Sequence, residues 1–281
     1  MKPIEADKLL LDNVLGLSCI ENYTLYILHN HGCDYRFLYA KSFVQIFDIA
    51  KALCDENIPY AYFNKIPRLQ DMSHKAGLIQ LSTYFDFEEA VARHEYCCIK
   101  VTPSYVRGRY SRELWRDDHF ILLCNRNGDS WTCLNDNPRD VMDISTKELR
   151  SAYAGQAICI CLMKKTFEAC QKEDFLKEFQ DSVHEAHKSY DFSLISVETA
   201  RDILGVIRVL RKRMWEYCSL YFDASFMRDY LMKLDKTYAM TEYMRLRNRP
   251  DLDKINRLLE ELQMEDLKTI EMVNQQMELV K

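Results

Sequence analysis

A change of residue pattern near Cys170 constrains the fold of this 281-residue chain more than any other feature. Before it, short stretches of β-branched, aromatic and other apolar residues are typical of strands, at residues 96–102, 120–124, 131–134 and 156–163. After it, apolar residues recur at helical spacing, which predicts helices over residues 173–188, 196–222, 225–247, 251–261 and 263–280. The sequence therefore predicts an α+β protein, with an antiparallel sheet in a domain over residues 1–168 and a helical bundle over residues 169–281.

Helical patterns also occur between the strands of the first domain. Residues 42–57 have an apolar stripe at helical spacing, and residues 86–94 have acidic side chains in the first turn, as the helix dipole favours. Residues 103–116 separate two of the strands and are predicted to form a long loop that contains arginines.

Ser18-Cys19-Ile20-Glu21 has the S-x-x-E pattern of a capping box, which predicts a helix that starts here and ends at Gly32. Cys19 is then the first helical residue. Its sulfur would lie near free backbone N–H groups at the positive end of the helix dipole, which favours the thiolate and predicts a lowered pKa.

Asn127-Gly128 is a strong β-hairpin signal, because a type I′ turn needs positive φ at both central residues. If these two residues form the loop, His119 lies directly opposite Asp136 on the neighbouring strand. Side chains paired in this way are close enough for a carboxylate to hydrogen-bond an imidazole and fix its tautomer. The second ring nitrogen of His119 would then be available to a thiol.

The composition argues against several classes of function. The chain has 11 cysteines and no secretory signal sequence, which indicates reduced thiols and a cytoplasmic location. No C-x-x-C pair occurs, and the adjacent Cys97 and Cys98 would point to opposite faces of a strand, so no metal site is expected. The formal net charge is −5 and neither half of the chain is basic, which argues against nucleic acid as a partner. No apolar run is long enough to span a membrane, so no membrane partner is expected.

Taken singly, each candidate residue is more often structural, since free cysteines are usually small core residues. Together, a thiol at a helix start, a histidine at a strand start and an acid across the hairpin form the cysteine version of a catalytic triad. The order of Cys19, His119-Phe120 and Asp136 within Asn135-Asp136-Asn137-Pro138 resembles that of papain-like cysteine enzymes. It resembles more closely the bacteriocin-leader cysteine peptidases and the butirosin-type carrier-protein acyltransferases, and the chain is similar in plan to the amide synthetases of closthioamide-type assembly.

This resemblance covers approximately residues 10–165 and implies a papain-like catalytic core that acts in thiotemplated natural-product biosynthesis. It implies that Cys19 attacks the acyl thioester of an acyl or peptidyl carrier protein, and that an amine or diamine then takes the acyl chain. His119 would act as general base and Asp136 would orient it. Asn13 stands where the family commonly has a glutamine, and is the candidate oxyanion donor together with the backbone N–H of Cys19. No cofactor of the enzyme itself is implied, because the phosphopantetheine arm arrives on the carrier protein.

Further residues are candidates for substrate contacts. Two basic groups suit an acidic carrier protein: the first is Arg107, Arg109, Arg112 and Arg116, and the second is Arg208, Arg211, Lys212 and Arg213. Asp117, with Trp115 and Tyr110 in the same segment, is the candidate site for the far ammonium group of a diamine. Two other functions remain open: a cysteine peptidase or thioester hydrolase with the same triad, and a non-enzymatic interaction protein in which the triad is vestigial and the helices bind a partner.

Overall fold

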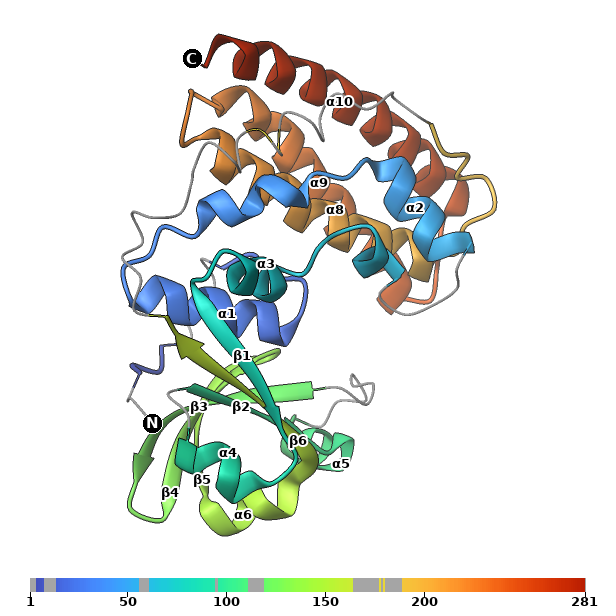
Figure 1. Ribbon diagram of the computed structural model, residues 1–281. Helices are drawn as coiled ribbons and strands as arrows, with labels where there is room; N and C mark the ends of the chain where they lie inside the picture. The colour runs from blue at the N-terminus through green and yellow to red at the C-terminus, as the bar shows by residue number, and fades with distance from the viewer. Residues whose placement is uncertain are drawn as a thin grey trace. The chain divides into compact units, whose positions relative to one another are not determined.

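The computed structural model describes residues 4–7, 14–55, 61–93, 96–110, 119–163, 177, 179 and 189–280 (Figure 1). The chain forms two compact units, one of residues 1–35 with 69–170 and the other of residues 36–68 with 171–281. The predicted division at residue 168 lies next to one boundary of these units. Residues 36–68, however, belong with the C-terminal helices, whereas the sequence assigned them to the first domain. The reason is that the apolar stripe of α2 (Ile46–Asp55) packs against a helix of the second unit.

The first unit, called the sheet unit below, contains a six-stranded sheet in which every neighbouring pair is antiparallel. This confirms the predicted antiparallel sheet. The strand order in the structure is β1-β6-β2-β3-β4-β5. The strands are β1 (Ile79–Tyr84), β2 (Tyr96–Val101), β3 (His119–Asn127), β4 (Ser130–Asp136), β5 (Arg139–Ser145) and β6 (Tyr153–Leu162). β5 was not predicted, because its sequence mixes charged and apolar residues without a continuous apolar run.

The hairpin between β3 and β4 turns one residue later than predicted. Asn127 pairs with Ser130, so the turn consists of Gly128 and Asp129, with Gly128 at φ 61°. An irregularity between Leu123 and Asn125 then shifts the pairing again. Asp136 pairs with Arg139 across the next hairpin, and the prediction that His119 lies directly opposite Asp136 is wrong.

Helices cover both faces of this sheet. α1 (Cys19–Asn30) lies on one side, and α4 (Phe87–Arg93) and α6 (Thr146–Ala152) lie on the other (Figure 1). The side with α4 and α6 holds a buried apolar core that includes Ile99, Ile121 and Trp131. Two further helices are α3 (Leu69–Lys75) and α5 (Pro103–Tyr110). The prediction of a loop from residue 103 onward is therefore wrong over α5, where the proline takes the first helical position, which suits its fixed φ.

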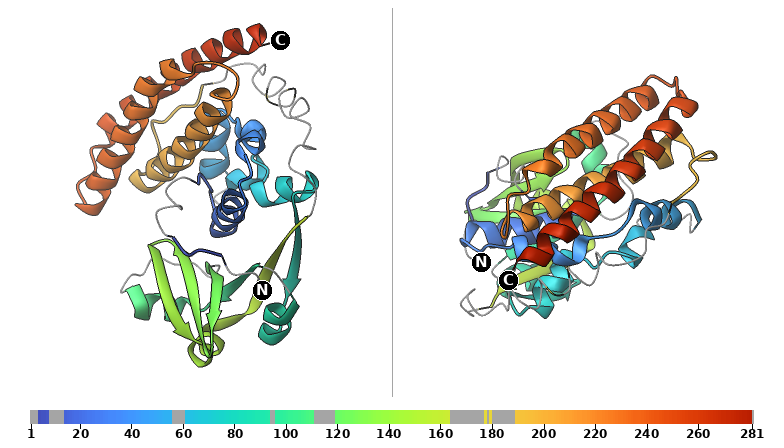
Figure 2. Two further views of the ribbon diagram at one scale, coloured as in Figure 1. Left: turned by 90° about the vertical axis from the view of Figure 1, so that its left-hand side faces the viewer. Right: turned by 90° about the horizontal axis from the view of Figure 1, so that it is seen from above.

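The second unit, called the helical unit below, confirms the predicted C-terminal helices. Three long helices lie side by side (Figure 2): α8 (Val197–Cys218), α9 (Arg228–Leu246) and α10 (Leu252–Leu279). The unit also contains 3₁₀ helices at Arg36–Ser42, Ala61–Asn64 and Ser225–Met227. The two predicted helices at 251–261 and 263–280 are one helix, because Leu262 is buried at 0% exposure and nothing between them breaks the backbone. The predicted helix at 173–188 lies outside the described residues.

A buried ion pair joins two helices of this unit. Arg211 donates from Nε and Nη2 to the two carboxylate oxygens of Asp266, at 2.5 and 2.7 Å, and the hydroxyl of Tyr230 donates to the same carboxylate at 2.7 Å. Arg211 and Arg213 are both 0% exposed, and Arg208 and Lys212 bind Asp235. In the second basic group predicted from the sequence, Arg211 and Arg213 therefore lie in the interior, whereas Arg208 and Lys212 are partly exposed and paired with an acidic side chain. Among the described helices, none combines the length and the apolar character that crossing a membrane requires.

Candidate active site at the start of helix α1

Cys19 is the first residue of α1, and the segment before it is held by side chains of the same helix. Ser18 caps the helix by accepting a hydrogen bond from the backbone N–H of Glu21 at 3.3 Å, as the capping box predicts. The carboxylate of Glu21 is buried and accepts from the backbone N–H of Leu17 at 2.6 Å. Its other oxygen accepts from the backbone N–H of Leu69, which ties α1 to the start of α3.

The thiol of Cys19 is in an environment that keeps its proton. The residue retains some accessible surface, but burial of the sulfur raises its pKa from 9.0 to about 12, and the negative charge of Asp136 adds to this effect. Hydrogen bonding from the backbone of Phe120, Ile20 and Cys19 itself acts in the opposite direction. The prediction of a lowered pKa is therefore wrong, since loss of hydration outweighs the backbone N–H groups at the helix start.

His119 is held by Asn135. The Nε2 atom of His119 lies 2.6 Å from Oδ1 of Asn135, and the two residues are 4% and 0% exposed. The Nδ2 atom of Asn135 donates to the backbone oxygen of Pro138 at 2.6 Å, so Oδ1 is the end of the amide that faces the imidazole. A histidine oriented by an asparagine amide is the arrangement of papain-like Cys-His-Asn sites. The predicted orienting residue was Asp136, one position further along the chain. Asn135 was not predicted because the turn between β3 and β4 lies one residue later than the Asn127-Gly128 pattern indicates.

Asp136 lies near both other members of the predicted triad. Its carboxylate accepts from Nδ2 of Asn22 at 3.0 Å, and the hydroxyl of Tyr23 lies 3.5 Å from its second oxygen. Burial raises the pKa of Asp136, while the charge of His119 and the bonds from Asn22 and Tyr23 lower it. Asp136 also raises the pKa of Cys19, so its carboxylate lies within electrostatic range of the thiol and of the imidazole. Tyr23 completes the connection by donating to the backbone oxygen of Phe120 at 2.9 Å.

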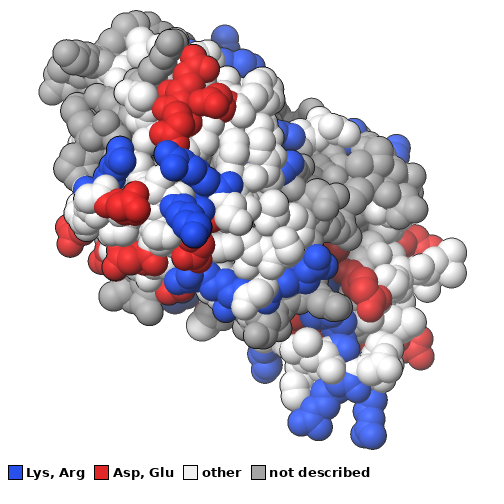
Figure 3. Space-filling model, turned by 90° about the horizontal axis from the view of Figure 1, so that it is seen from below, with Lys and Arg blue, Asp and Glu red and all other residues white. Residues whose placement is uncertain are grey.

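The remaining predicted site residues are only partly described. Asn13, Arg112, Trp115, Arg116 and Asp117 lie outside the described residues. Arg107 and Arg109 are exposed on α5, where Arg109 has Glu148 at 3.9 Å. Tyr110 is half-buried, and its hydroxyl donates to Asp140 at 3.1 Å. On the face drawn in Figure 3, basic and acidic side chains lie in neighbouring groups of both signs. The described part of the first basic group is thus two exposed arginines, one of which has an acidic neighbour.

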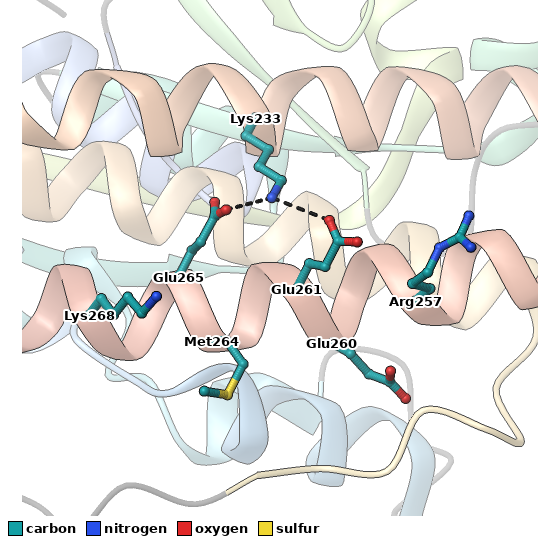
Figure 4. A pocket seen from close by; sticks show the side chains of 7 residues that line it. All are labelled: Lys233, Arg257, Glu260, Glu261, Met264, Glu265 and Lys268. Atoms are coloured by element: carbon teal, nitrogen blue, oxygen red, sulfur yellow. Dashed lines mark hydrogen bonds and ion pairs between the residues drawn. The ribbon is translucent and has the colours of Figure 1, made fainter.

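The helical unit has a shallow groove between α9 and α10 (Figure 4). In it, Lys233 binds Glu265 at 2.6 Å and Glu261 at 3.4 Å, and the lining as a whole has three basic and three acidic side chains. The groove is lined by Lys233, Arg257, Glu260, Glu261, Met264, Glu265 and Lys268. None of the predicted site residues is among them. No cluster of three or more His, Cys, Asp or Glu side chains suited to a metal ion occurs within the described ranges.

Comparison with known proteins identifies no family. The chain matches no protein-family model, and no curated protein matches its sequence.

Proposed function

We propose that this protein is a cysteine-dependent acyltransferase with a papain-like catalytic core, in which Cys19 is the nucleophile, His119 the general base and Asn135 the residue that orients the base. The observation that carries this proposal is the buried 2.6 Å contact between His119 and Asn135, on strands whose neighbouring residues Phe120 and Asp136 act on the sulfur of Cys19. A nucleophile near a base, with the base oriented by a third group, is the general arrangement of covalent catalysis.

The chemistry follows from these positions. His119 takes the proton of the Cys19 thiol as the sulfur attacks the carbonyl carbon of a thioester, and the backbone N–H of Cys19, at the start of α1, faces the developing oxyanion. The tetrahedral intermediate then expels the thiol of the donor, which leaves with the proton from His119. An acyl-enzyme on Cys19 remains, and an amine attacks it while His119 accepts the proton of the amine. The products are an amide and the regenerated thiol.

The raised pKa of Cys19 favours a thioester over a peptide as the acyl donor. A peptide bond has a poor leaving group, and cysteine peptidases of the papain type attack it with a thiolate whose pKa is strongly lowered. A thioester has an activated carbonyl and a thiol leaving group, so the exchange of one thiol for another requires a less activated nucleophile. A carrier protein as the source of the thioester, and a diamine as the acceptor, are the finer parts of the proposal and rest on the family resemblance.

The test is transfer from a short soluble acyl thioester, such as an acyl N-acetylcysteamine, to a panel of diamines, matched monoamines and water. We expect thiol release, an acyl adduct on Cys19 detected by mass spectrometry of the intact protein, and amide formation that exceeds hydrolysis. Cys19→Ala is expected to abolish both the adduct and turnover, whereas Cys54→Ala, at another partly exposed free cysteine, serves as the control. Absence of an adduct at Cys19 would refute the proposal, and hydrolysis faster than transfer to every amine would favour the peptidase or hydrolase alternative.

A further inference from the structure

Asn22 joins two segments that the candidate active site has to hold together. It lies three residues after Cys19 on α1, so the two side chains emerge on neighbouring parts of the same helix face. Its Oδ1 accepts from the backbone N–H of Gly16 at 3.0 Å, and its Nδ2 donates to Asp136 at 3.0 Å. One amide thus connects the segment that leads into Cys19 with the end of β4, next to Asn135.

The side-chain amide of Asn22 meets the requirements of both partners. The backbone N–H of Gly16 needs an acceptor and the carboxylate of Asp136 needs a donor, so the orientation of the Asn22 amide is fixed by its two partners. Aspartate at position 22 would keep the acceptor but place a second carboxylate against Asp136. Leucine, similar in shape, would remove both bonds.

Gly16 shows how closely the backbone approaches this amide. A Cβ atom at position 16 would lie 2.3 Å from Oδ1 of Asn22 and 2.7 Å from its backbone nitrogen, so any larger residue has to displace the segment or the helix. Gly16 has no positive φ, and the close approach to Asn22 is what demands a glycine here. The same contact can therefore be altered from either side, by a change at Asn22 or at Gly16.

We propose that Asn22 is a positioning residue for acyl transfer: through Gly16 and Asp136 it sets the segment before Cys19 against the strand end that holds the orienting Asn135. This inference rests on the proposed function, in which the N–H of Cys19 faces the oxyanion and His119 accepts the thiol proton. The backbone N–H of Cys19 and the imidazole of His119 have to be correctly positioned at the same time, because small displacements of catalytic groups strongly reduce the rate. Asn22 touches no reacting atom and acts through its two partners.

The test compares Asn22→Leu, Asn22→Asp and Gly16→Ala with Asn30→Ala. Asn30 is a matched control because it is on the same helix, is partly buried, and its side-chain amide donates to the backbone oxygen of Tyr26 at 2.9 Å, near the opposite end of α1. Thiol release from the short thioester is measured across pH, with thermal unfolding as the measure of folding. We expect Asn22→Leu and Gly16→Ala to reduce kcat by about 10- to 100-fold with little change in KM, and Asn30→Ala to stay close to wild type.

Asn22→Asp gives a readout that a merely structural role would not produce. Its carboxylate and that of Asp136 repel each other at neutral pH, but on acidification they can share one proton and restore a hydrogen bond between positions 22 and 136. We expect the kcat of Asn22→Asp, as a ratio to wild type, to recover as the pH falls, whereas the ratio for Asn22→Leu stays constant. Wild-type kcat in Asn22→Leu, or the same flat ratio in both variants, would overturn the proposal.

A second measurement separates this inference from the proposed function. If wild-type protein releases no thiol from any thioester, the proposed function fails, and the rate of alkylation of Cys19 by iodoacetamide still tests the role of Asn22. The added carboxylate of Asn22→Asp is expected to slow alkylation at pH 9 by about tenfold relative to Asn30→Ala, because a nearby negative charge disfavours the thiolate. Equal alkylation rates in Asn22→Asp, Asn22→Leu and Asn30→Ala would overturn the proposal whatever the enzyme catalyses.

Discussion

Replacing Asn135 by alanine tests which residue orients His119. In the structure, Oδ1 of Asn135 lies 2.6 Å from Nε2 of His119, and His119 is only 4% exposed, so water has little access to replace the lost acceptor. A buried donor left without a partner costs about 1–3 kcal/mol. If this cost appears in the activation free energy, the rate of acyl-enzyme formation falls by about 5- to 150-fold.

The assay is single-turnover formation of the Cys19 adduct from the short thioester, followed by mass spectrometry. Asn135→Asp keeps an acceptor for His119 but loses the donor to Pro138, so its rate is expected to lie between those of wild type and Asn135→Ala. Asp136→Asn keeps an oxygen that can accept from Asn22, and its loss of rate is expected to be smaller than that of Asn135→Ala. A larger loss in Asp136→Asn would refute the reasoning and return the orienting role to Asp136.

Three further predictions concern reactivity and stability. Because the pKa of Cys19 is raised to about 12, its thiolate fraction at pH 8 is about one in ten thousand. Iodoacetamide is therefore expected to label Cys19 roughly a thousand times more slowly than free cysteine. Labelling as fast as that of free cysteine would contradict this prediction. Burial raises the pKa of Asp136 above its ordinary 3.8, so the folded state binds the proton more tightly and loses stability as the pH rises above that value. The Tm of wild type relative to Asp136→Asn is therefore expected to fall between pH 4 and pH 7, and a constant difference would show that Asp136 titrates normally. Asp266→Asn leaves the buried Arg211 without its counter-charge and is expected to lower the free energy of unfolding in urea by about 3–5 kcal/mol. The control Asp235→Asn, in a partly exposed ion pair, is expected to lower it by less than about 1 kcal/mol. Equal losses in the two variants would contradict the stabilising role of the buried pair.

The sequence was sufficient where local pattern decides the structure. The capping box at Ser18 and the stop at Gly32 located α1, and the change of periodicity near Cys170 separated the strands from the long helices. These features depend on neighbouring residues along the chain, whose hydrogen-bonding and packing preferences act over one or two turns. The sequence also placed Cys19 at the first helical position, which any capped helix starting at Ser18 requires.

Only the tertiary structure decided how distant residues meet. A turn one residue later than predicted and an irregularity at the middle of β3 moved the register, so that His119 does not lie opposite Asp136 and its Nε2 atom contacts Asn135. The pKa of Cys19 depends on burial and on Asp136, which lies 117 positions away, and both outweigh the local effect of the helix start. Residues 36–68 likewise joined the helical unit because the apolar face of α2 packs against α8, a contact between segments well over a hundred residues apart. Register, burial and long-range packing are properties of the whole fold, since each depends on which surfaces the remaining chain brings together.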